Sequence, residues 1–184
     1  MIRRKQLCCS QFAIRMLLGI FLGLSLGLTA SARERKIIQK SATDPQLRAG
    51  ETFIDQGNPT TVNAKLPVLT VQSLLNANKR AIVQFDFSFL PNVGIKSALL
   101  TLHIVTTPES TFNYEAFPLA SFFNQPDATW DTRVADLIWG TPGGDFGNTP
   151  TATATVVPGS TSATWNITKD VQSWYAGTPN YGTI

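Results

Sequence analysis

The side chains that could carry acid–base or metal chemistry are few and scattered in this 184-residue chain. His103 is the only histidine, so a cage of histidine ligands is excluded and a histidine-assisted nucleophile would depend on this one residue. Glu109 and Glu115 have the chemistry of a carboxylate pair that cleaves glycosidic bonds. They lie around a turn, however, and no pattern in the flanking residues indicates a raised pKa for either carboxyl group. We interpret both as solvated surface acids and assign no catalytic residue.

Two turns carry the oxygen-bearing side chains that calcium prefers. Asp55 and Asn58 flank one glycine, and Asp145 and Asn148 flank another in a long glycine-rich stretch. Calcium takes roughly six to eight oxygen ligands from carboxylates, amides and backbone carbonyls. These four residues are therefore candidate ligands of a structural calcium ion. The alternative is that Asp, Asn and Gly stand there only because they form turns.

The start of the chain has the pattern of a secretory leader. The basic stretch RRK precedes the apolar run MLLGIFLGLSLGLTASA, and Ala30 and Ala32 form an A-x-A cleavage site. This order predicts a signal peptide over residues 1–32. The apolar stretch from 16 to 29 is shorter than the ~20 residues that span a membrane as a helix, and an uncleaved anchor is the alternative. We expect a secreted, extracellular protein with no stable membrane span after cleavage.

Removal of the leader would change the charge and the cysteine content. Cys8 and Cys9 are the only cysteines, so the remaining chain would have no disulfide. Four of the 15 lysines and arginines precede the cleavage site and all 12 acids follow it, which turns the net charge from +3 to −1. A nucleic-acid-binding domain shows a basic face. Nucleic acid is therefore excluded as a partner.

The pattern of the remaining chain is that of β-structure. Residues 33–50 are charged, lack sustained periodicity and are predicted to form a flexible linker. Residues 51–184 form the predicted domain. Within it, the stretch RAIVQFDFSFLP has apolar residues at every second position from Ala81 to Phe89, which is typical of a strand with one buried face.

One segment near the C-terminus has helical spacing instead. In NITKDVQSWYAG we expect Thr168 to cap the helix, Asp170 to favour its first turn and Gly177 to end it. Many short strands with one short helix predict an all-β, jelly-roll-like β-sandwich.

The strand and helix motifs also occur in a known order. The chain resembles the DNRLRE-type domain, also classed as carbohydrate-binding module family 96, from about Glu51 to its last residue. The resemblance rests on four segments: ETFIDQGNPTT, NKRAIVQFDFSFLPNVGIKSALLTLHIV, ATWDTRVADLIWGTPGGDFG and ATWNITKDVQSWYAGTPNYG. It implies a secreted bacterial jelly-roll module that binds an acidic polysaccharide such as alginate.

The resemblance also implies that the domain is incomplete at its C-terminus. Domains of this family continue past the Asn-Tyr-Gly motif into a strand and then a final strand, whereas this chain stops at Ile184. We therefore expect the last strand or strands to be missing. Either the gene is split or degenerate, or a strand-donating chain or downstream domain supplies the strand.

For polysaccharide binding, aromatic rings would stack on sugar faces and cations would pair with uronate carboxylates. The candidate stacking residues, with the best exposed first, are Trp139, Tyr114 and Tyr181. The candidate cations are Lys79, Arg80 and Arg133. For Arg80, a structural ion pair is the alternative. The other tryptophans are assigned to the core: Trp130, Trp165 and Trp174.

These observations favour a secreted, non-catalytic polysaccharide-binding module. A structural or adhesion module, or a fragment of a larger cell-surface protein, is the first alternative. An accessory fragment of a polysaccharide lyase or hydrolase is the second.

Overall fold

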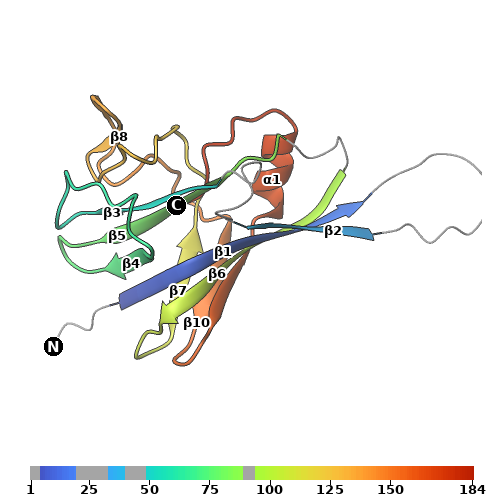
Figure 1. Cartoon of the computed structure of the whole chain (residues 1–184), viewed down its shortest axis with the longest axis horizontal. Coiled ribbons are helices and arrows are strands. Elements are labelled where there is room, and N and C mark those ends of the chain that lie inside the picture. The colour runs from blue at the N-terminus through green and yellow to red at the C-terminus, as the bar shows by residue number, and fades with distance from the viewer. Residues whose placement is uncertain (1–4, 20–32, 40–48, 89–93) are drawn as a thin grey trace, which may run out of the picture.

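The computed structural model describes residues 5–19, 33–39, 49–88 and 94–184 (Figure 1). This part of the chain forms eleven strands and one helix. Their bounds are β1 Lys5–Gly19, β2 Arg33–Gln39, β3 Ala49–Asp55, β4 Leu69–Ser73, β5 Lys79–Phe85, β6 Gly94–Thr106, β7 Phe112–Ala116, β8 Thr132–Val134, β9 Leu137–Ile138, β10 Ala152–Val156, β11 Ser162–Asn166 and α1 Thr168–Tyr175.

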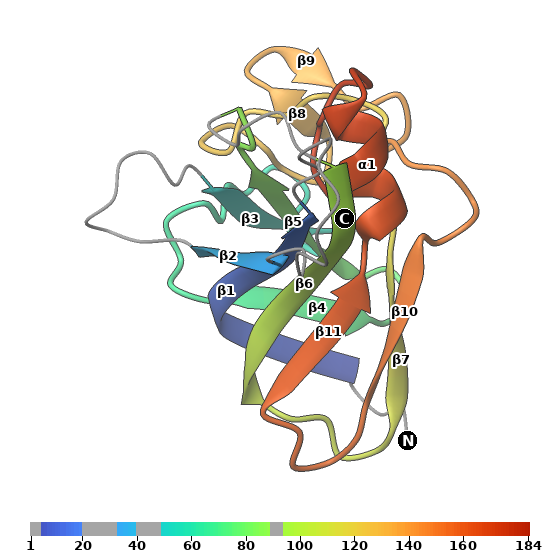
Figure 2. The same cartoon turned by 90° about the vertical axis from the view of Figure 1, so that its right-hand side faces the viewer.

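The strands form a sandwich of two unequal layers. Among the described residues, one sheet has seven strands in the order β11-β6-β1-β4-β5-β3, with β2 paired to β1. The antiparallel pair β7 and β10 forms the facing layer, and β8 and β9 make a separate small hairpin (Figure 2). The prediction of an all-β, sandwich-like fold with one short helix near the C-terminus is confirmed.

The main core lies between the two layers. Alternate residues of β7 and β10 point inward, so that Tyr114 and Ala116 meet the buried side chains of the large sheet. Trp165 and Trp174 belong to this core as predicted, the latter partly buried at its margin. The core residues contributed by the large sheet include Phe53, Leu69, Val83, Phe85, Ile95, Ala98, Leu100, Leu102, Ala163 and Trp165.

Strand β5 is buried on both faces. Val83 and Phe85 face the main core as the alternation predicts, but Ile82 on the opposite face is also fully buried. The segment from 117 to 146 folds over that face and encloses a second core. Its buried members are Ile54, Ile82, Leu119, Phe123, Ala128, Trp130 and Trp139.

The predicted C-terminal helix is present as α1. Asp170 lies in its first turn, and Gly177 follows the helix with a φ of 110°, a backbone conformation that glycine adopts readily. The prediction that Thr168 caps the helix is wrong. Ile167 is the N-cap residue, and the Thr168 hydroxyl instead accepts the backbone N–H of Ala98 at 2.9 Å, which ties the helix to β6.

Two segments that the sequence analysis assigned to the leader and the linker contain strands. Lys5–Gly19 forms β1 within the large sheet, and Arg33–Gln39 forms β2 beside it. For residues 33–39 the expectation of a flexible linker is therefore corrected, while 40–48 lie outside the described residues. Apolar residues are common to leaders and to central strands, so composition alone does not separate the two.

The last residues of the chain pair with the body of the fold. Thr183 and Val83 exchange two backbone hydrogen bonds of 2.8 Å, and Ile184 exchanges two of 2.9 Å with Phe117. These bonds hold the segment that follows β7 against β5. Among the residues that the structure describes, no helix has the length and apolar character to cross a membrane.

Candidate functional site

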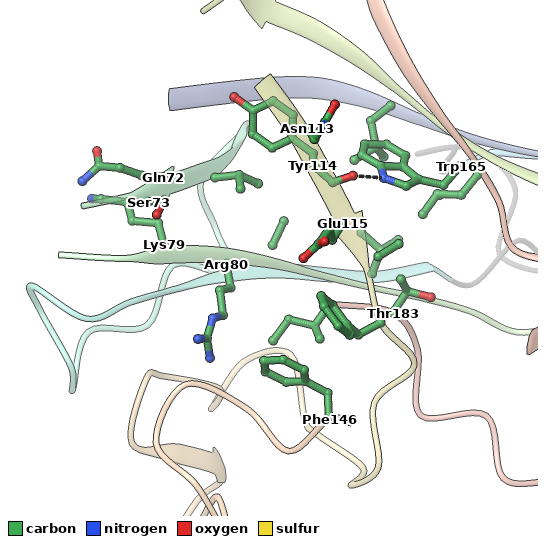
Figure 3. Close-up of a pocket in the computed structure, with 18 of the residues that line it drawn as sticks. Gln72, Ser73, Lys79, Arg80, Asn113, Tyr114, Glu115, Phe146, Trp165 and Thr183 are labelled. Carbon is green, nitrogen blue, oxygen red and sulfur yellow. Dashed lines mark hydrogen bonds between the residues drawn. The ribbon is translucent and has the colours of Figure 1, made fainter. Parts of the chain in front are cut away.

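A cleft opens between the two layers, with β4 and β5 on one side and β7 on the other (Figure 3). Its volume is about 380 Å³. The side chains at its floor are apolar and come from β5, β6 and β11: Ala81, Val83, Leu100, Leu102 and Trp165. Pockets of this size with an apolar floor and a few polar groups are typical of ligand sites.

Polar side chains line the rim of this cleft. Glu115 and Asn113 are exposed residues of β7 that alternate with the inward-facing Tyr114. Lys79 and Ser73 contribute from the opposite side. The rim therefore presents a carboxylate, an amide, an ammonium group and a hydroxyl, a set that can hydrogen-bond a hydroxyl-rich ligand.

Lys79 is held at the rim by an ion pair. Its Nζ lies 2.7 Å from Asp55 Oδ2, and its side chain remains 25% exposed. The same Nζ lies 5.7 Å from the centre of the Phe53 ring. Lys79 therefore has a fixed position but still reaches solvent.

Asp55 uses its carboxylate within its own turn. Oδ1 accepts the N–H of Gly57 at 2.9 Å, and Oδ2 accepts the amide of Asn58 at 3.0 Å in addition to Lys79. Burial by itself would raise the pKa of Asp55, but the hydrogen bonds from Lys79, Asn58 and Gly57 outweigh it and leave the pKa below its usual value.

A pH dependence of stability follows from this lowered pKa. A carboxylate with a lower pKa in the folded state stabilises the protein above its unfolded pKa of about 4, and this contribution is lost as the pH falls through the folded value. We expect Asp55→Asn to reduce stability at neutral pH and to lose less stability than the wild type between about pH 5 and pH 2. Urea unfolding at a series of pH values measures this, with the exposed Glu109→Gln as the control. Parallel curves for Asp55→Asn and the wild type would contradict the account.

In the second proposed calcium-binding turn, the aspartate likewise uses its carboxylate for hydrogen bonds within the loop. Asp145 accepts the N–H groups of Gly140 at 3.1 Å and Thr141 at 2.8 Å. Burial opposes ionisation of Asp145, but these bonds, with Ser121 and the charge of Arg133, lower its pKa. Asn148 is exposed on the same loop.

Within the described ranges, no three His, Cys, Asp or Glu residues gather into a metal-binding group. The geometry thus shows the turn-forming role of both aspartates, and calcium binding stays a prediction.

Arg80 lies between the cleft and the second core. Its guanidinium carbon is 4.8 Å from the centre of the Trp130 ring and 4.9 Å from that of Phe146. Nη1 donates to the carbonyl of Gly143 at 2.6 Å. In Figure 3 the side chain extends toward Phe146 and away from Glu115. Burial lowers the pKa of Arg80 below its usual value, but the group stays charged at neutral pH. Arg80 therefore has a structural role: it packs against two aromatic rings and donates a hydrogen bond to a backbone carbonyl.

The predicted stacking residues do not form an exposed platform. Trp139 is only 1% exposed and donates its indole N–H to the carbonyl of Thr129 at 2.9 Å, so its prediction as an exposed ring is wrong. Tyr114 is 8% exposed because it lies on the inward face of β7, which corrects its prediction as well. Tyr181 is partly buried against the second core. Trp130 is buried, as predicted.

The remaining predicted residues lie at separate places. Arg133 donates to the carbonyl of Phe122 at 3.2 Å and lies over the ring of the same residue, outside the cleft lining. His103 is exposed on β6, as expected for a surface position. Of the six predicted ligand-binding residues, Lys79, Arg80 and Tyr114 line the cleft.

Sequence reasoning did not predict the polar rim as a site. Glu115 is exposed, as its interpretation as a solvated surface acid predicts, and its alternation with Tyr114 in the stretch FNYEA is the signal that places it beside the core. Searches against protein-family models, curated proteins and solved structures found no match to this chain.

Proposed function

We propose that this protein is a secreted, non-catalytic module that binds polysaccharide in the cleft between β5 and β7. The observation that carries the proposal is the cleft itself, in which an apolar floor meets a rim of exposed hydrogen-bonding groups. A sugar ring presents C–H groups on its faces and hydroxyl groups around its edge. The floor suits the faces, and the amide, hydroxyl and charged groups of the rim suit the edge.

Binding without catalysis fits the carboxylates that lie near this cleft. Glycoside hydrolysis usually needs two carboxyl groups on opposite sides of the bond. Among the described residues that line the cleft, Glu115 is the carboxylate, and the nearby Asp55 is engaged by Lys79 and its own turn. This arrangement supports a binding site better than a hydrolytic one.

An acidic glycan such as alginate is the ligand class that we propose. Lys79 is a partly exposed cation of the rim, where it can meet a uronate carboxylate. Glu115 lines the same cleft and opposes that charge, so the two residues should have opposite effects on binding.

The prediction is tested by electrophoresis of the full chain through gels that contain alginate, pectin or neutral glucan, with and without calcium. We expect retardation by an acidic glycan. Glu115→Gln should tighten this binding and Lys79→Gln should weaken it. Each change should be about 1.4- to fivefold in Kd, because exposed charge pairs contribute ~0.2–1 kcal/mol.

Matched controls remove the same charges elsewhere. Glu109→Gln and Lys169→Gln alter exposed residues outside the cleft lining and should leave the mobility shift unchanged. Free migration of the folded wild type in every gel would contradict the proposed function. Equal effects of the rim variants and their controls would contradict the proposed site.

A further inference from the structure

A slot for one strand runs through the middle of the large sheet, and β1 occupies it. On one edge β1 pairs antiparallel with β6, from Cys8↔Thr106 to Gly19↔Gly94. On the other edge its first residues pair with β4, from Lys5↔Ser73 to Cys9↔Leu69. In Figure 1 β1 extends along β6 for most of its length. The slot between β6 and β4 is thus lined by backbone on both sides.

The pairing register between β1 and β6 matches the alternation of buried and exposed residues along β6. Apolar residues of β1 stand opposite four buried residues of β6 that belong to the main core. The β1 sequence therefore has the spacing that a strand at this position requires. The four pairs are Phe12↔Leu102, Ile14↔Leu100, Met16↔Ala98 and Leu18↔Ile95.

The other edge of β6 is already used. Strand β11 pairs with it from Ser162↔His103 to Asn166↔Leu99. Removal of β1 would open the N–H and C=O groups on the remaining edge of β6, and would uncover the core beside Leu100 and Leu102. An open edge of this kind is a template for another strand.

The strand in the slot belongs to the segment that the sequence predicts to be cleaved. A signal peptidase that cuts after Ala32 would release all of β1. The exported protein would then have an open slot of up to 13 residues along β6. Its core face carries Leu100 and Leu102, and its outer face carries the partly exposed Thr101 and the exposed His103.

We propose that the slot between β6 and β4 is a strand-acceptor site, and that the exported protein binds there an extended segment of a partner polypeptide. The partner strand runs antiparallel to β6, like β1, and has apolar residues at every second position and polar residues between them. Main-chain hydrogen bonds supply affinity, and the alternation fixes the register. Residues 5–19 occupy the slot in the precursor.

A strand-exchange experiment on the full chain tests the proposal. A protease site replaces residues 41–46, between β2 and β3, and the folded protein is cut there. The cut protein is unfolded in urea and refolded with excess labelled peptide of sequence Lys5–Gly19, with serine in place of Cys8 and Cys9. We expect the labelled peptide to co-elute with the protein on gel filtration. A peptide with aspartate in place of Ile14 and Met16 should bind at least tenfold more weakly.

A second measurement does not depend on refolding. Hydrogen exchange of the protein collected after export should show rapid exchange of those β6 amides that face β1, while the amides that pair with β11 stay protected. The same peptide should slow the exchange at the β1 edge. A refolded protein that excludes the peptide, or an exported protein whose β6 amides at the β1 edge are protected without any partner, would overturn the proposal. So would an exported protein whose intact mass still includes Lys5–Gly19. None of these readouts depends on glycan binding.

Discussion

Replacement of Trp139 by alanine is expected to lower the free energy of unfolding by about 3–5 kcal/mol. The indole is 1% exposed within the second core, so its removal leaves a cavity against Ile54 and Ile82. It also deprives the carbonyl of Thr129 of its hydrogen-bond donor. Urea unfolding of the variant measures the loss.

The neighbouring residue provides the control. Ile138 is 73% exposed on the small β8–β9 hairpin, and Ile138→Ala should change stability by less than about 0.5 kcal/mol. A Trp139→Ala variant as stable as Ile138→Ala would show that the indole is not enclosed. Trp139→Phe should fall between the two, since it keeps most of the apolar contact and loses the hydrogen bond.

The second large effect is expected for Arg80. Arg80→Ala removes a charged hydrogen bond to Gly143 and the contact of the guanidinium with two rings. Together these interactions predict a loss of about 2–4 kcal/mol. Arg133→Ala is the matched control and should cost less than about 1 kcal/mol, because the hydrogen bond from Arg133 to the carbonyl of Phe122 is exposed.

The surroundings of Gly143 give an independent check on Arg80. Gly143 has a φ of 92°, and a Cβ there would lie 2.6 Å from both Arg80 Nη1 and Trp130 Cζ2. Gly143→Ala should therefore destabilise the same contact through strain and steric conflict. If Arg80→Ala matched Arg133→Ala in stability, the stacked arrangement would be contradicted. If Gly143→Ala were neutral, the close approach of this loop would be contradicted as well.

The elements that the sequence predicted best are those with a local cause. The alternation from Ala81 to Phe89 predicted β5, and the spacing after Ile167 with a glycine at 177 predicted α1. In both cases the hydrophobic periodicity and the residues that end the element are features of the local sequence. The prediction that Thr168 caps α1 was wrong because its hydroxyl accepts the backbone N–H of Ala98, 70 positions away in the sequence.

The candidate site was harder to predict because it depends on distant contacts. The local sequence around Trp139 is the same whether the glycine-rich loop lies open or folds over β5. What buries the indole is its pairing with Thr129 and Asp131 and its packing on Ile82. The cleft likewise joins β4, β5 and β7, which no local pattern places together.

The central claim is that the cleft between β5 and β7 binds a glycan. The most direct measurement is an amide NMR titration of the isotopically labelled full chain with an oligosaccharide of the polysaccharide that retards it. The account predicts that the largest shift changes fall on 71–73, 78–81 and 112–117, which line the cleft. Changes confined to the loop from 137 to 149, or no change at saturating oligosaccharide, would contradict it.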